Sequence, residues 1–167
     1  MTEEKTGDAL RNELAAEIEQ AFDGVKREDG TTLQAARVLD DYGSRPDQLE
    51  PGQADTQDRW QDISRDTIEE LYDAVAFLDA KGFCYYLPAY MVWTLRCGLE
   101  SDCPAAACVT QELLRPDRQK EAESLTPDQL RATARFLEFV SQRDEAYGQA
   151  AVSAGDALER HWGRHLA

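Results

Sequence analysis

Apolar residues recur every three or four positions along most of this chain, which is the spacing of one face of an α-helix. Residues 8–22 predict an amphipathic helix with an apolar stripe, and residues 32–42 predict a second, shorter helix. Ser64 is a good N-cap for a third helix over residues 65–80. No run of alternating apolar and polar residues predicts a β-strand, so the pattern favours an all-α protein.

The stretch GFCYYLPAYMVWTLRCG, residues 82–98, is the most apolar and aromatic part of the chain. Gly82 is predicted to end the preceding helix, and residues 83–87 are expected to be extended because they precede a proline. Pro88 is predicted to open a helix over residues 88–99 that is apolar nearly all round, which is typical of a buried central helix. It is too short to cross a bilayer, which needs about 20 residues.

Three further helices are predicted in the second half. They cover residues 104–114, 127–142 and 144–162, with a polar loop at 115–124. Thr126 and Gln129 form a capping-box signature at the start of the second of these helices. The pattern predicts a single compact all-α bundle of about six helices around the apolar helix 88–99. We expect one domain over residues 1–167, with the first few residues and residues 44–58 loop-like.

The net charge of −15 changes the functional expectations. Residues 1–80 hold 21 acidic and 8 basic residues, and residues 81–167 hold 12 and 10. So acidic a chain disfavours nucleic acid and anionic membranes as partners and favours a basic protein partner, although the charge is also explained by solubility alone. The polar N-terminus has no apolar signal segment, so the cytoplasm is the expected location.

Few residues form a pattern that suggests chemistry. The cysteines at 84, 97, 103 and 108 contain no CxxC pair and are expected to be reduced and partly buried, although Cys97, Cys103 and Cys108 could converge on a metal. His161 and His165 are expected in a frayed C-terminal tail. With no nucleophile motif and no phosphate-binding loop, we expect no catalytic residue, cofactor or resident metal, and the balance favours a protein that is not an enzyme.

Aromatic residues and neighbouring acids supply the candidate interaction or pocket residues. These are Asp40, Asp41, Trp60, Asp62, Tyr85, Tyr86, Tyr90 and Trp93. A buried tyrosine needs a hydrogen-bond partner for its hydroxyl. The tyrosines therefore either line a pocket or a partner-binding rim, or belong to the core with their tips reaching the surface or an acid such as Asp41 or Asp62.

Several motifs together resemble a family of small bacterial proteins of unknown function. The motifs are Leu39, Asp40 and Tyr42, then Trp60 with Asp62 and Ile63, FLDAKGFCYYLPAYM at 77–91, LTPDQ at 125–129, FLEFV at 136–140, and Trp162. The resemblance spans roughly residues 10–162, and its most distinctive part is the glycine followed by YLPAY. It implies a coherent fold and transfers no catalytic residue, because the family has no established activity.

Three functional hypotheses remain open. The first is a protein-binding module, such as an immunity or accessory factor that neutralises a basic toxin or effector, with the acidic half for steering and an aromatic patch for affinity. The second is a small enzyme or ligand-binding domain whose pocket is walled by Tyr85, Tyr86, Tyr90 and Trp93, with an aspartate as acid or base. The third is a structural subunit without its own activity. The sequence leaves the oligomeric state open.

Overall fold

Helices follow one another throughout the part of the chain that the structure describes. The structure is a computed structural model that describes residues 2–42 and 59–166, with side chains at 7–37 and 59–166. Its α-helices are α1 (Thr2–Ala21), α2 (Leu33–Tyr42), α3 (Arg65–Glu70), α4 (Ala80–Cys97), α5 (Ala105–Leu114), α6 (Pro116–Glu121), α7 (Pro127–Ser141), α8 (Asp144–Tyr147) and α9 (Gln149–Arg160). Short 3-10 segments are η2 (Trp60–Asp62), η3 (Ala74–Phe77), η4 (Gly98–Glu100), η5 (Ala122–Ser124) and η6 (Trp162–His165). No strand occurs among these residues, which confirms the all-α class, and the loop predicted at 44–58 lies outside them.

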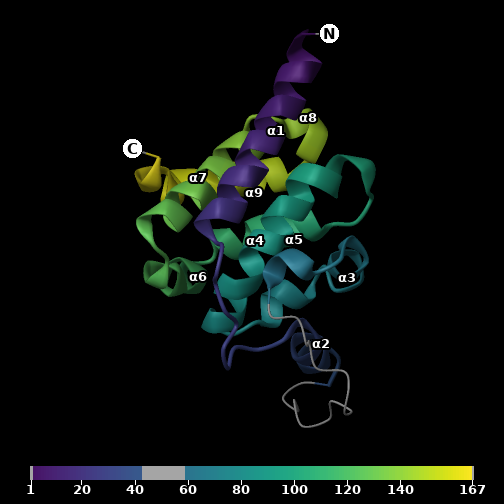
Figure 1. Ribbon diagram of the computed structural model, residues 1–167, viewed down its shortest axis with the longest axis vertical. Coiled ribbons are helices and arrows are strands. Elements are labelled where there is room, and N and C mark those ends of the chain that lie inside the picture. Colours follow the sequence, from purple (N-terminus) through teal and green to yellow (C-terminus); the bar gives the residue numbers. More distant parts are fainter. Residues whose placement is uncertain (1, 43–58, 167) are drawn as a thin grey trace.

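The helix α4 is the centre of the bundle. It packs against α1, α3, α5 and η2, while α5 and α7 pack against α9 (Figure 1). The expected central apolar helix is therefore confirmed in its role, but it begins at Ala80 rather than Pro88 and ends at Cys97. Because it has 18 residues, α4 is long enough to contact all of these elements.

Asp79 fixes the start of α4. Its carboxylate accepts hydrogen bonds from the backbone N–H of Gly82 at 2.8 Å and of Thr31 at 2.9 Å, so one N-cap joins the helix to the segment before α2. A Cβ on Gly82 would lie 2.6 Å from the Thr31 carbonyl oxygen. The prediction that Gly82 ends a helix is therefore wrong, because this glycine allows a close backbone approach inside the first turn of α4.

Pro88 lies inside α4, and the predicted extended segment 83–87 is helical. A proline inside a helix costs about 3 kcal/mol. Each large apolar side chain that becomes fully buried contributes about 1.5–3 kcal/mol, and Phe83, Leu87 and Met91 are all fully buried on the two sides of the proline. Burial along the continuous helix therefore outweighs the local preference that the sequence shows.

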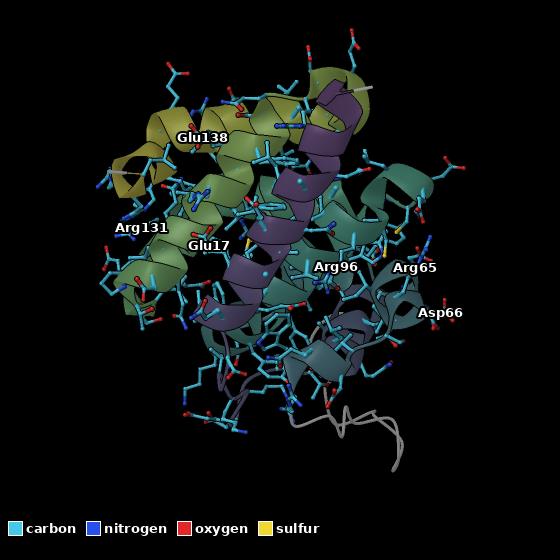
Figure 2. The ribbon with its side chains drawn as sticks, turned by 45° about the horizontal axis from the view of Figure 1, so that its top comes forward. Glu17, Arg65, Asp66, Arg96, Arg131 and Glu138 are labelled. Atoms are coloured by element: carbon cyan, nitrogen blue, oxygen red, sulfur yellow. The ribbon has the colours of Figure 1, made fainter. Side chains whose placement is uncertain are left out.

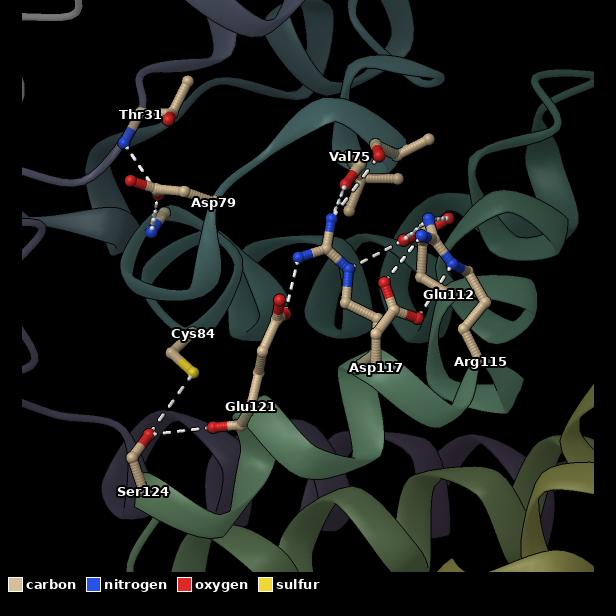
Figure 3. A network of polar contacts seen from close by, with 12 residues as sticks. Thr31, Val75, Asp79, Cys84, Glu112, Arg115, Asp117, Glu121 and Ser124 are labelled. Atoms are coloured by element: carbon tan, nitrogen blue, oxygen red, sulfur yellow. Dashed lines mark hydrogen bonds and ion pairs between the residues drawn. The ribbon is translucent and has the colours of Figure 1, made fainter.

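The helix predicted over 65–80 is interrupted after α3, because its carbonyl groups have partners elsewhere in the fold. The carbonyl oxygen of Glu70 accepts from Arg37 at 2.6 Å, and that of Leu71 accepts from the Tyr90 hydroxyl at 2.7 Å. Farther along, Arg118 of α6 donates to the Val75 carbonyl at 3.2 Å, and Figure 3 shows this contact. These tertiary hydrogen bonds, together with local ones such as that from the Ala74 N–H to the Leu71 carbonyl at 3.1 Å, replace those of a continuous helix, and the segment turns through η3 instead.

Local signals in the sequence identify two helix starts correctly. The Ser64 hydroxyl accepts from the Thr67 N–H at 3.1 Å and caps α3. Thr126 and Gln129 make both hydrogen bonds of the predicted capping box, at 3.0 and 3.2 Å. The Gln129 side chain also donates to the Ala21 carbonyl at 3.1 Å, which joins α7 to the end of α1. The predicted loop at 115–124, by contrast, forms α6 and η5.

The C-terminal segment is packed rather than frayed, which corrects the expected tail. The helix predicted over 144–162 divides at Gly148, whose φ of +53° favours glycine. After α9, Trp162 is fully buried and donates its indole N–H to the Leu113 carbonyl at 2.8 Å. His161 and His165 each lie edge-on to Trp162, and their ring centroids are 5.7 Å apart.

This packing predicts a loss of stability in mild acid. Burial and, to a smaller extent, the charge of Arg164 lower the pKa of His161 and of His165 below the usual value of 6.5. The neutral imidazoles therefore stabilise the fold fully above pH 6.5, and this contribution is lost as the pH falls through the lowered pKa values. Urea unfolding is measured at about pH 7.5 and pH 5.5, where carboxylates stay ionised. The free energy of unfolding should fall more between these two pH values for the wild type than for the His161→Gln/His165→Gln variant. If the free energy of unfolding fell equally for the two proteins, these histidines would not be the cause of the acid sensitivity.

Candidate functional site

One face of α4 forms the floor of a pocket. Ala89, Val92, Trp93, Arg96 and Cys97 all line it. Their spacing of three and four residues places them on the same side of the helix. The sequence of α4 therefore presents small and aromatic side chains in the middle of this face and a cation near its C-terminal end.

Three other elements close the pocket. The further lining residues are Glu19 of α1, Trp60 and Gln61 of η2, Ile63, and Arg65 and Ile68 of α3. We call the cavity the Trp60–Trp93 pocket, after its two tryptophans, and its volume is about 170 Å³. Its walls are mainly aromatic and aliphatic, while its charged groups stand at the sides contributed by α1, α3 and the end of α4.

The two tryptophans are held differently. The indole N–H of Trp60 donates to the Phe22 carbonyl at 2.9 Å, which fixes the ring between α1 and α4. The indole N–H of Trp93 is buried and makes no hydrogen bond of ordinary geometry in the described chain, although it contributes to lowering the pKa of Glu69. Trp93 is therefore positioned mainly by packing, whereas Trp60 is positioned by packing and a hydrogen bond.

Both arginines of the pocket are paired with carboxylates of the same chain. Arg96 Nη1 lies 2.6 Å from Glu19 Oε1, and Arg65 Nε lies 2.8 Å from Glu69 Oε1. The hydrogen bond from Arg65 is the main cause that lowers the pKa of Glu69, so this carboxylate stays ionised at neutral pH. Glu100 approaches Arg65 as well, at 3.6 Å. The pocket rim therefore has more carboxylates than cations.

The outer face of α3 adds further negative charge next to the pocket. Asp66 and Glu70 are exposed, are four residues apart, and make no ion pair with any residue that the structure describes. Figure 2 shows Arg65 and Asp66 at the outside of α3 and Arg96 nearer to α1. The described surface beside the pocket is thus acidic, although two arginines contribute to the pocket itself.

The structure divides the predicted candidate residues into four groups. Trp60 and Trp93 line the pocket, and Asp62 is exposed at the end of η2. Tyr85, Tyr86 and Tyr90 are fully buried in the core and are not among the lining residues. The side chains of Asp40 and Asp41 lie outside the described residues.

Packing explains why the tyrosines belong to the core. The rings of Tyr85 and Tyr86 meet edge to face with centroids 4.8 Å apart. The Tyr90 hydroxyl donates to the Leu71 carbonyl, and burial strongly raises its pKa, so it remains protonated. A pocket walled by these three tyrosines and Trp93 is therefore not what the fold forms, and the pocket uses Trp60 with Trp93 instead.

Sequence reasoning missed the two arginines of the pocket. Arg96 is the only charged residue between Gly82 and Leu99, and it follows Trp93 by three residues. A lone cation next to a tryptophan on an apolar helix is a signal that could have identified it. Arg65 offers no comparable signal, because it lies among the acids of α3.

The cysteines show no sign of activation. All four are free and half-buried, and burial raises the pKa of each thiol, to about 11 for Cys108. Cys97 lines the pocket, yet at neutral pH it is a thiol rather than the nucleophilic thiolate. Among the described residues, no three His, Cys, Asp or Glu side chains are placed to hold a metal ion.

A second, more polar hollow of about 360 Å³ lies between α1 and α7. It is lined by Glu17, Gln20, Ala21, Thr126, Asp128 and Arg131, and Figure 2 labels Glu17 and Arg131. Its only apolar lining residue is Ala21, and its charged groups have both signs. This hollow offers no defined set of ligand groups, so the Trp60–Trp93 pocket is the better candidate site.

Comparisons with known proteins identify the family. The model of a family of unknown function (DUF6714) matches residues 10–166, and the chain belongs to this family. No curated protein and no solved structure matches the chain. Within residues 2–42 and 59–166, no helix combines the length and the apolar character that are needed to cross a membrane.

Proposed function

We propose that this family member is a cytoplasmic protein-binding module that docks on a basic protein partner, as an immunity or accessory factor does when it neutralises a basic toxin or effector. One observation carries the proposal, namely the acidic segment beside the Trp60–Trp93 pocket. Residues 59–73 contain five carboxylates and two cations, Arg59 and Arg65, and Arg65 is already paired with Glu69 while Asp73 lies 3.6 Å from Arg37. A surface of this kind attracts a basic protein and repels nucleic acid.

The size of the pocket favours protein binding over catalysis. Sites for small-molecule ligands are commonly about 300–1,000 Å³, whereas this pocket is about 170 Å³. Its titratable side chains are also engaged, because Glu19 holds Arg96 and the Cys97 thiol is protonated. These features support a site for one side chain of a partner better than a site for a substrate with an acid or base.

A rescue experiment tests the immunity role. The product of the gene immediately upstream is expressed in bacteria alone and together with the full chain. We expect the product alone to be toxic and the co-expressed chain to restore growth. A non-toxic metabolic enzyme in that position, or toxicity that the chain does not relieve, would contradict the role.

A matched pair of charge variants tests whether the acidic face of α3 steers the partner. Asp66→Asn/Glu70→Gln should slow association with the toxin identified in the rescue experiment by about threefold or more at low salt, because rim charges act mainly on the association rate. Glu145→Gln/Glu159→Gln removes the same charge from exposed sites on α8 and α9 and should have little effect. Association rates are measured by stopped flow at low and high salt. Equal slowing by the two variants would mean that only the net charge matters.

A further inference from the structure

The volume of the Trp60–Trp93 pocket fits a single side chain. Cavities of about 150 Å³ with apolar walls accept one benzene-sized ring. The present pocket has about 170 Å³ and walls that include Trp60, Trp93 and Ile68. A phenylalanine, leucine or methionine side chain matches both the size and the apolar character of this space.

The charges around the pocket restrict what can flank that side chain. Arg65 and Arg96 are already neutralised by Glu69 and Glu19, so an acidic partner would have to displace one of these carboxylates. A lysine or arginine of the partner would instead find Asp66 exposed on the outer face of α3, without an ion pair in the described chain. Charge complementarity therefore favours basic flanking residues.

The two tryptophan walls suit an anchor of this kind. Trp60 is fixed by its hydrogen bond to the Phe22 carbonyl, and Trp93, which is only 4% exposed, is held mainly by packing, so both walls are in place before the side chain enters. Apolar anchors that enter a pocket at the centre of an interface commonly contribute most of the binding energy. A rim of paired charges around the anchor would exclude water from it.

We propose that the Trp60–Trp93 pocket receives one bulky apolar side chain from a protein partner, carried on a segment with lysine or arginine next to it. This inference rests on the proposed protein-binding function and specifies its contact point. The anchor provides affinity in the pocket, and the basic flanks pair with the carboxylates of α3.

A displayed library of random 12-residue peptides, selected on the immobilised full chain, tests the proposal. We expect enriched peptides to share an aromatic or large aliphatic residue with Lys or Arg within three positions. Ala89→Phe, which places a ring in the pocket, should weaken binding of a synthetic enriched peptide at least tenfold. Val152→Phe introduces the same ring at an exposed site on α9 and should change the Kd less than twofold.

Val92→Phe is the second blocking variant, because Val92 is only half-buried in the pocket wall and its replacement demands less repacking. Thermal unfolding shows which blocking variant keeps the native fold, and binding is measured on that variant. No enrichment, a motif with acidic flanks, or binding that a folded blocking variant leaves unchanged would overturn the proposal. Dimerisation of the chain that Ala89→Phe abolishes would assign the pocket to a second copy and would also overturn it.

The proposed function and this inference can fail separately. If the blocking variants still restore growth of cells that express the toxic partner, while Asp66→Asn/Glu70→Gln slows association, then the acidic face binds the partner and the pocket does not. If no toxic or basic partner exists, the proposed function fails whatever the peptide selection shows.

Discussion

Replacing Arg118 by alanine should lower the free energy of unfolding by about 3–5 kcal/mol, because it leaves a buried carboxylate without its main partner. Only 2% of Arg118 is exposed. Its guanidinium donates to Glu112 at 2.8 Å, to Glu121 at 2.7 Å and to the Val75 carbonyl (Figure 3). It also stacks on the Phe83 ring of α4 at 4.4 Å. Urea unfolding followed by circular dichroism measures the change.

Arg135→Ala is the matched control for this prediction. Arg135 pairs with Glu17 at 2.6 Å, yet 51% of its side chain is exposed. Exposed pairs contribute about 0–1 kcal/mol, so the two arginines should differ severalfold although both ion pairs are short. Similar losses for Arg118→Ala and Arg135→Ala would mean that the network around Arg118 is not a buried one.

Trp93→Ala should also lower the free energy of unfolding by about 3–5 kcal/mol, because Trp93 lies on the central helix and is only 4% exposed. The residue is both a wall of the pocket and part of the core, so its removal enlarges an existing cavity. A loss below about 1 kcal/mol in a denaturant melt would contradict its burial.

Phenylalanine variants separate packing from hydrogen bonding at the two tryptophans. Trp93→Phe removes ring area but no hydrogen bond of ordinary geometry. Trp60→Phe also removes the bond to the Phe22 carbonyl and should therefore cost about 1 kcal/mol more. The opposite order would contradict the different roles given to the two indole N–H groups.

Local signals made part of the fold predictable from the sequence. Ser64 and the pair Thr126 and Gln129 act within a few residues of themselves, so their caps could be identified without knowing the fold. Gly82 and Pro88 misled the prediction because their usual meaning is overridden by distant residues. Gly82 is required by the approach of Thr31, some fifty residues earlier, which no local pattern shows.

The break in the helix after α3 also arises from distant residues. The carbonyl groups of residues 70, 71 and 75 accept hydrogen bonds from Arg37, Tyr90 and Arg118, which come from three other helices. Apolar periodicity over residues 65–80 describes which side chains are buried but not where the backbone hydrogen bonds go. The apolar spacing therefore correctly indicated that Ile68 is buried, while the predicted continuous helix over residues 65–80 was wrong.

The candidate site was predictable only in part. Aromatic content pointed to Trp60 and Trp93, and both line the pocket. The same reasoning included Tyr85, Tyr86 and Tyr90, which the long α4 buries on its core side. Moving the start of α4 from Pro88 to Ala80 adds two turns of helix, and these turns carry Tyr85 and Tyr86 into the core. Tyr90 already lay in the predicted helix, and its hydroxyl is buried against the Leu71 carbonyl.

Three tryptophan indole signals offer the most direct test that the Trp60–Trp93 pocket is the binding site. The full chain, labelled with ¹⁵N, is titrated with an enriched peptide, and the indole N–H resonances are assigned by Trp→Phe variants. We expect the signals of Trp60 and Trp93 to shift in a saturable way, while Trp162, buried against the Leu113 carbonyl, stays in place. Saturable binding that leaves Trp60 and Trp93 unchanged, or that shifts only Trp162, would contradict the assignment of this pocket.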